Sequence, residues 1–161
     1  MEERRRTSWP SVGPTTDAPP ARSIRSDTFA KQHLVLVVDD RAENRELCHE
    51  CLSFAGFQVI EGRDGAEALK LAGERLPDVI VMDVAMPVMD GYEACRLLKG
   101  DARTKFIPVI LLTATPRGTE ADDPNVDALL LKPCTQEDLE TEVRKWVEVR
   151  RARERDTATT E

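Results

Sequence analysis

No long apolar run is present in the 161 residues of this chain. A membrane-spanning helix needs roughly 20 consecutive apolar residues, and no run here approaches that length. The basic cluster Arg4, Arg5 and Arg6 is followed by Trp9 and Pro10 and not by an apolar segment, so a secretory signal is not expected either. The sequence therefore predicts a protein without a membrane anchor.

Cysteine is also scarce, with only Cys48, Cys51, Cys95 and Cys134 present. This is too few, in too loop-poor a context, for a disulfide-stapled scaffold, so we expect reduced thiols and a cytoplasmic location. Cys48, His49 and Cys51 could suggest zinc, but a structural zinc site needs four ligands and no matching pair is present. Ordinary core or surface cysteines are the favoured interpretation.

Composition divides the chain into three parts. Residues 1–31 are rich in Pro, Ser, Thr and Arg with few apolar residues, which predicts a disordered N-terminal tail. Residues 32–149 carry apolar runs and helical patterns typical of one domain. Residues 150–161 are a charged run with a polar end, which predicts a flexible C-terminal tail. The formal net charge of −7 argues against non-specific nucleic-acid binding and favours a cation or a basic partner.

Short apolar runs alternate with helically spaced residues inside 32–149. The unbroken apolar run at 34–38 contains three valines, as expected of a strand buried on both faces. Further strands are expected at 57–60, 79–82, 109–112 and 128–131, and helices at 42–55, 64–75, 91–99 and after Thr135. This alternation predicts an α/β domain with a parallel sheet covered by helices on both faces.

Two local signals refine this pattern. Thr135 and Asp138 have the spacing of a capping box at the start of the last helix. The segment 114–127 contains Pro116 and Gly118, followed by a second proline, and these residues disfavour a long helix. We expect a shortened or irregular fourth helix there.

Polar side chains follow four of the predicted strands. Asp39 and Asp40 end the first, Asp83 the third, Thr113 the fourth and Lys132 the fifth. Ligands of open parallel sheets bind at the carboxyl ends of the strands. Three carboxylates brought together there repel one another, and a hard cation such as Mg²⁺ would relieve that repulsion. A single aspartate after a strand is usually a cap or turn residue, but an ordered set on four strands favours phosphoryl chemistry on a carboxylate.

Four segments in this order resemble a bacterial two-component response-regulator receiver domain. They are 34–40 (LVLVVDD), 83–91 (DVAMPVMDG), 107–114 (IPVILLTA) and 131–133 (LKP). The resemblance covers roughly residues 33–148. It implies a flavodoxin-like, doubly wound sheet of five parallel strands in the order 2-1-3-4-5.

The resemblance also implies a role for each residue at the strand ends. Asp83 would accept a phosphoryl group from a kinase phosphohistidine, Thr113 would bond that group, and Lys132 would pair with it. The peptide bond between Lys132 and Pro133 would be cis.

The implied metal site consists of oxygen ligands. Asp39, Asp40 and Asp83, together with the backbone carbonyl of Ala85, would hold Mg²⁺. A receiver domain is not an enzyme beyond assisting its own phosphoryl transfer and dephosphorylation.

The implied partners follow from the same resemblance. A sensor histidine kinase or a phosphotransfer protein would donate the phosphoryl group, and an output protein of unknown identity would receive the signal by direct contact. No DNA-binding or catalytic output domain fits in the residues left over, so we expect a stand-alone switch that is a monomer or weak dimer.

The chain departs from the family at Leu129, where an aromatic switch residue is usual. Together with the unusual segment 114–127, this favours one alternative, a phosphorylation-independent scaffold or binding module. An enzyme is a third alternative. Asp39-Asp40-Arg41 stands where a flavodoxin has its phosphate loop, and the Asp-x-Asp nucleophile pattern of a haloacid dehalogenase-type phosphatase is absent from the first strand.

Overall fold

The computed structural model describes residues 33–115 and 123–159, so the tail predicted at 1–31 lies outside the described residues. Strands and helices alternate along the chain, as the sequence predicted. In order they are β1 (Leu34–Val38), α3 (Ala42–Phe54), β2 (Gln58–Gly62), α4 (Gly65–Arg75), β3 (Val79–Asp83), α5 (Gly91–Gly100), β4 (Val109–Thr113), β5 (Ala128–Leu131) and α6 (Gln136–Thr159).

The five strands form one parallel sheet in the order β2-β1-β3-β4-β5. This confirms the flavodoxin-like topology that the resemblance implied. Every residue of β3 and β4 is buried, because helices cover both faces of the sheet and leave no polar side to these central strands. β2 lies on one side of β1 and β3 on the other, so the order in which strands are added to the sheet reverses between β1 and β3. Ligands of such sheets bind near that point.

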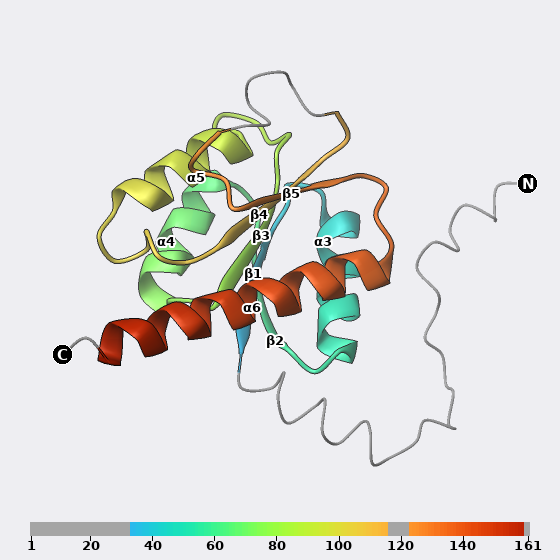
Figure 1. Ribbon diagram of the computed structural model, residues 1–161. Coiled ribbons are helices and arrows are strands. Elements are labelled where there is room, and N and C mark those ends of the chain that lie inside the picture. Colours follow the sequence, from blue (N-terminus) through green and yellow to red (C-terminus); the bar gives the residue numbers. More distant parts are fainter. Residues whose placement is uncertain (1–32, 116–122, 160–161) are drawn as a thin grey trace, which may run out of the picture.

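Two helical layers enclose the sheet (Figure 1). Helices α3 and α6 lie on one face, where Leu52, Leu139 and Val143 belong to one buried apolar cluster. Helices α4 and α5 lie on the other face, where Ala68 and Leu98 belong to a second cluster. The sheet therefore divides the apolar core in two, and polar residues occupy the edge of the sheet at the strand ends.

Side-chain caps fix where the helices begin. Asp64 caps α4 by accepting a hydrogen bond from the Glu67 amide at 2.9 Å. The predicted capping box at α6 is confirmed, since Thr135 and Asp138 each accept the other's backbone amide at 3.0 Å. These hydrogen bonds hold the pKa of Asp138 below its ordinary value.

The last helix is longer than its sequence pattern indicated. A flexible tail was predicted from residue 150, but α6 continues to Thr159. Arg150 pairs with Glu154 one turn on at 3.3 Å and donates to the Pro77 carbonyl at 2.6 Å. Arginine and glutamate favour helix formation, and charge pairs four residues apart stabilise a helix. A charged composition alone was therefore not sufficient to predict a flexible tail.

The segment between β4 and β5 is only partly described. Its residues 116–122 lie outside the described part of the chain, and most of the predicted irregular fourth helix falls there. The described remainder is a turn, with the Asn125 amide donating to Asp123 Oδ1 at 2.8 Å. Within residues 33–115 and 123–159, no helix has the length and apolar character needed to cross a membrane.

Candidate functional site

The carboxyl ends of β1, β3, β4 and β5 meet at one edge of the sheet. These four strands are parallel neighbours, with Asp83 in register with Leu112 and Thr113 in register with Leu131. Asp83 and Thr113 are the last residues of their strands. The residues that follow β1 and β5 therefore reach the same edge, as the sequence predicted.

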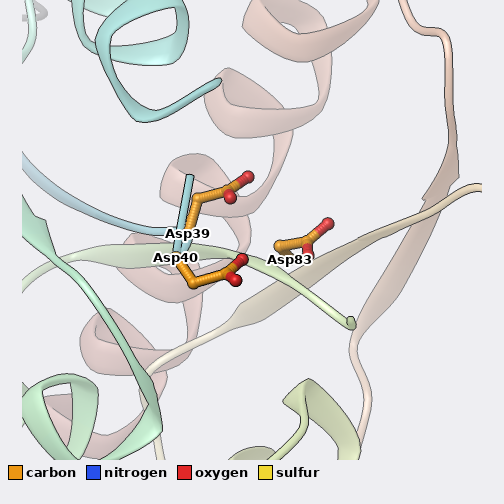
Figure 2. Close-up of side chains that lie close together, drawn as sticks. All are labelled: Asp39, Asp40 and Asp83. Carbon is orange, nitrogen blue, oxygen red and sulfur yellow. The ribbon is translucent and has the colours of Figure 1, made fainter. Parts of the chain in front are cut away.

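Three carboxylates form an acidic cluster at this edge, made of Asp39, Asp40 and Asp83. One oxygen of each lies within 4.8 Å of the others. Figure 2 shows the three side chains gathered in one small region beyond the strand ends. Asp39 and Asp83 are buried and Asp40 is exposed, so the cluster reaches solvent through Asp40.

Burial and charge repulsion disfavour the ionised form of Asp39. Its pKa is raised, first by burial and then by the charges of Asp83 and Asp40. The Arg41 amide, which donates to Asp39 Oδ1 at 2.9 Å, and the charge of Lys132 oppose this rise without cancelling it. The cluster thus carries an excess of negative charge in a partly buried site, and a bound cation would stabilise it.

Lys132 places a positive charge directly against Asp83. Its ammonium group lies 2.5 Å from Asp83 Oδ1. Its backbone amide donates to the Thr113 carbonyl at 2.8 Å, which ties the end of β5 to β4. The bond to Pro133 is cis, as the resemblance implied.

Thr113 lines the same site from the end of β4. Its side chain is buried, and its hydroxyl donates to the Thr115 carbonyl at 3.0 Å. Thr113 borders a cavity of about 280 Å³. The residues lining this cavity are Asp40, Arg41, Asn44, Asp83, Ala85, Thr113, Ala114 and Lys132.

No sequence motif marked Arg41 or Asn44 as a site residue. Both line the cavity because α3 begins at Ala42, directly after the acidic pair at the end of β1. The first helical turn therefore borders the site. The short interval between Asp40 and the start of the helix could have indicated this.

The loop after β3 returns tightly onto the backbone of Asp83. A Cβ atom on Gly91 would lie 2.7 Å from the Asp83 carbonyl oxygen and 2.9 Å from the Cα of Val84. The Gly91 amide donates to the Val84 carbonyl at 2.9 Å, and Asp90 caps α5. Gly91 thus allows α5 to pack directly against the segment that carries Asp83.

Leu129 and the cysteines do not add a second chemical centre. Leu129 is half-buried and packs against the apolar cluster on the α4–α5 face. Burial raises the pKa of Cys48 and Cys51 to about 12, and His49 contacts Glu61. In the described part of the chain, the acidic cluster is the group of side chains spaced to hold a metal ion.

A parallel sheet in this order, with an acidic cluster and a lysine at its rim, defines a receiver-type α/β domain. The family model described as "Response regulator receiver domain" matches residues 35–144, which is more than half of the chain. The chain therefore belongs to the response-regulator receiver family of two-component signal transduction.

Particular relatives agree with this assignment. The chain is 38% identical over 127 residues to the response regulator MprA of Mycobacterium tuberculosis, covering 77% of this chain and 54% of that protein. The chain spans about half or less of the length of the curated relatives that it matches.

Solved structures share the fold. The signal receiver domain of a signal transduction histidine kinase from Syntrophus aciditrophicus has a TM-score of 0.68 and 34% identity, covering 72% of this chain and 90% of that one. The receiver domain of sensor histidine kinase PA1611 from Pseudomonas aeruginosa, described with a magnesium ion coordinated in the active site cleft, has a TM-score of 0.67 and 27% identity, covering 72% and 98%.

Proposed function

We propose that Asp83 is the phosphoacceptor of a two-component or phosphorelay signalling protein. The donor would be the phosphohistidine of a sensor histidine kinase or phosphotransfer protein, and the reaction would depend on Mg²⁺. The observation that carries this proposal is the buried Asp83 carboxylate, which lies within 4.8 Å of two further carboxylates and 2.5 Å from the Lys132 ammonium. Together with a bound Mg²⁺, that set would position a phosphoryl group and balance its negative charge.

The transfer is a displacement at phosphorus. A carboxylate oxygen of Asp83 forms the new P–O bond while the P–N bond of the phosphohistidine breaks, and the electron pair of that bond returns to the imidazole nitrogen. Lys132 balances charge on the phosphoryl oxygens, and little other covalent chemistry is asked of the protein. The same site would later admit the water that hydrolyses the aspartyl phosphate, so the chain only assists reactions of its own side chain.

The acidic cluster fits the implied metal. Oxygen donors suit Mg²⁺, and the ligands would be Asp39, Asp40, Asp83 and the backbone carbonyl of Ala85. Burial raises the pKa of Asp39, and the charges of Asp83 and Asp40 add to that rise; a cation would offset both effects. When bound, the ion would neutralise negative charge on the carboxylates and on the phosphoryl oxygens. The magnesium described in the PA1611 receiver domain supports this assignment.

Thr113 offers a route for the signal to leave the site. Its hydroxyl, which donates to the Thr115 carbonyl at 3.0 Å, would instead donate to a phosphoryl oxygen. This exchange releases the backbone that leads into the segment after β4. Phosphorylation would thereby bias a two-state equilibrium and change contacts with an output protein.

One observation favours a second function, a phosphorylation-independent binding module. Leu129 packs into the apolar cluster and offers no polar group to a partner surface. A scaffold of this kind would bind its partner equally well with and without phosphate on Asp83. Measuring partner affinity in both states separates the two functions.

Incubation with acetyl phosphate and Mg²⁺ tests the leading proposal. Intact-mass spectrometry should show one added phosphoryl group, removable by hydroxylamine as expected of an acyl phosphate. The group should be absent without Mg²⁺ and absent in Asp83→Asn. The matched control is Asp64→Asn, since asparagine caps a helix as well as aspartate does. A phosphoryl group that persists in Asp83→Asn would refute the proposal.

A further inference from the structure

A hydrogen-bonded chain of side chains runs from the surface of α3 to the backbone of the acidic cluster. Arg45 Nη1 donates to the Asp39 carbonyl at 2.9 Å, and Arg45 Nε donates to Glu61 Oε1 at 3.1 Å. The other Glu61 oxygen lies 2.5 Å from His49 Nδ1. The Arg45 side chain is only 15% exposed, so its guanidinium is held between α3 and the end of β2.

The local structure explains why these three residues meet. Arg45 and His49 are four residues apart on α3 and therefore share one face of the helix. Glu61 lies near the end of β2, in register with Val37 of β1. The helix that follows β1 thus passes over the end of β2, and its two basic side chains reach the two oxygens of one carboxylate.

The contact with Asp39 is a contact with its main chain. The carbonyl that Arg45 binds belongs to the peptide group joining Asp39 to Asp40. The Asp39 amide is held separately, since it donates to the Gly62 carbonyl at 3.2 Å. Both sides of Asp39 are thereby anchored to the β2 strand end, directly through Gly62 and indirectly through Arg45 and Glu61. Fixing this peptide group sets the direction in which both carboxylates leave the backbone.

We propose that Arg45 is a positioning residue for the acidic cluster, with Glu61 and His49 holding its guanidinium in place. This inference rests on the proposed function, because the geometry that Arg45 maintains is that of the metal-binding pair Asp39 and Asp40. Groups that orient metal ligands without touching the metal commonly change metal affinity by about tenfold or more. Arg45 therefore sets how tightly this site takes Mg²⁺.

The direct test is the affinity of Arg45→Met for Mg²⁺, followed by amide chemical shifts. Methionine keeps the apolar stem of the side chain and removes its hydrogen-bond donors. We expect the dissociation constant to rise about tenfold, with a smaller rise in Glu61→Gln and partial recovery in Arg45→Lys. With acetyl phosphate, the Mg²⁺ concentration for half-maximal phosphorylation should rise, while the rate at saturating Mg²⁺ stays near that of the parent.

Arg150→Met is the matched control. Arg150 is also a largely buried arginine that donates to a backbone carbonyl and pairs with a glutamate. Its carbonyl belongs to Pro77, ahead of β3 and therefore at the opposite end of the sheet from the site. If Arg45 were merely structural, both variants would lower thermal stability and neither would change Mg²⁺ affinity.

A metal-free measurement keeps this inference separate from the proposed function. The Arg41 amide donates to Asp39 Oδ1 at 2.9 Å, so its hydrogen exchange reports whether that carboxylate is held in place. Exchange should be faster in Arg45→Met, and in Glu61→Gln if the first variant does not fold. Unchanged exchange together with Mg²⁺ affinity within about twofold of the parent would overturn the positioning role. Failure of the parent to bind Mg²⁺ would instead overturn the proposed function, and exchange alone would then decide the role of Arg45.

Discussion

The ionised side chain of Asp39 suits it to bind a cation but lowers the stability of the folded protein. Its carboxylate is buried beside Asp83, and both effects raise its pKa. An acid whose pKa is raised on folding binds its proton more tightly in the folded state, so its ionised form costs stability above that pKa. The cost disappears when the pH falls below the ordinary carboxyl range, near about 4.

We therefore predict that Asp39→Asn stabilises the metal-free protein at neutral pH. The expected gain is on the order of 1 kcal/mol, because the substitution removes a buried charge that two neighbouring carboxylates also repel. Urea unfolding with chelator present measures it. Added Mg²⁺ should stabilise the parent more than the variant, since a ligand that binds only the folded state raises its stability. An Asp39→Asn protein that is less stable than the parent without metal would show that the charge of Asp39 does not destabilise the fold.

Gly91 occupies a position where a larger side chain does not fit. An added Cβ would meet the Asp83 carbonyl oxygen at 2.7 Å, so Gly91→Ala must displace the backbone that carries the phosphoacceptor. We predict a loss of about 1–3 kcal/mol of stability and slower phosphorylation by acetyl phosphate. Gly100→Ala is the control in the same helix, because a Cβ there meets no atom within 4 Å. Equal effects of the two substitutions would show that the close approach is unimportant.

The elements were predicted well where a local signal marks their ends. The capping box at Thr135 and Asp138 placed the start of α6 correctly. Its end was misjudged, because a run of arginines and glutamates reads equally as a solvated tail or as an exposed helix. The helix is held in place by Arg150, which contacts the carbonyl of Pro77. Pro77 is distant in sequence, so no local pattern could have indicated this contact.

The capping box of α6 makes the stability of this helix depend on pH. Hydrogen bonds from the Thr135 backbone and side chain lower the pKa of Asp138. A carboxylate with a lowered folded-state pKa contributes stability above its ordinary pKa and loses it as the pH falls through the folded value. We predict that Asp138→Asn is less stable than the parent at neutral pH and equal to it well below about pH 4.

Thermal unfolding across this pH range measures the effect, and Glu137→Gln is the control. Glu137 lies in the same first turn of α6, so its substitution removes the same favourable interaction with the helix dipole. The difference between the two variants isolates the hydrogen bonds of the capping box. A difference that does not depend on pH would count against the assigned cause.

At the scale of the whole molecule, topology converts separate strand ends into one site. The alternation of strands and helices predicted a parallel sheet, but it cannot fix the order of the strands, and only the resemblance implied it. Once β1, β3, β4 and β5 are neighbours, Asp39, Asp83, Thr113 and Lys132 must meet. The role of Arg45 could not be predicted, because it depends on β2 lying beside β1 and on Glu61, near the end of β2, lying close to the start of α3.

We propose that this convergence makes Asp83 the residue that receives phosphate. The most direct measurement is to phosphorylate the full chain with acetyl phosphate and Mg²⁺, trap the aspartyl phosphate by borohydride reduction to homoserine, and map the product by peptide mass spectrometry. We predict homoserine at position 83 and at no other aspartate. Homoserine at Asp39 or Asp40, or none at all with Mg²⁺ present, would contradict it.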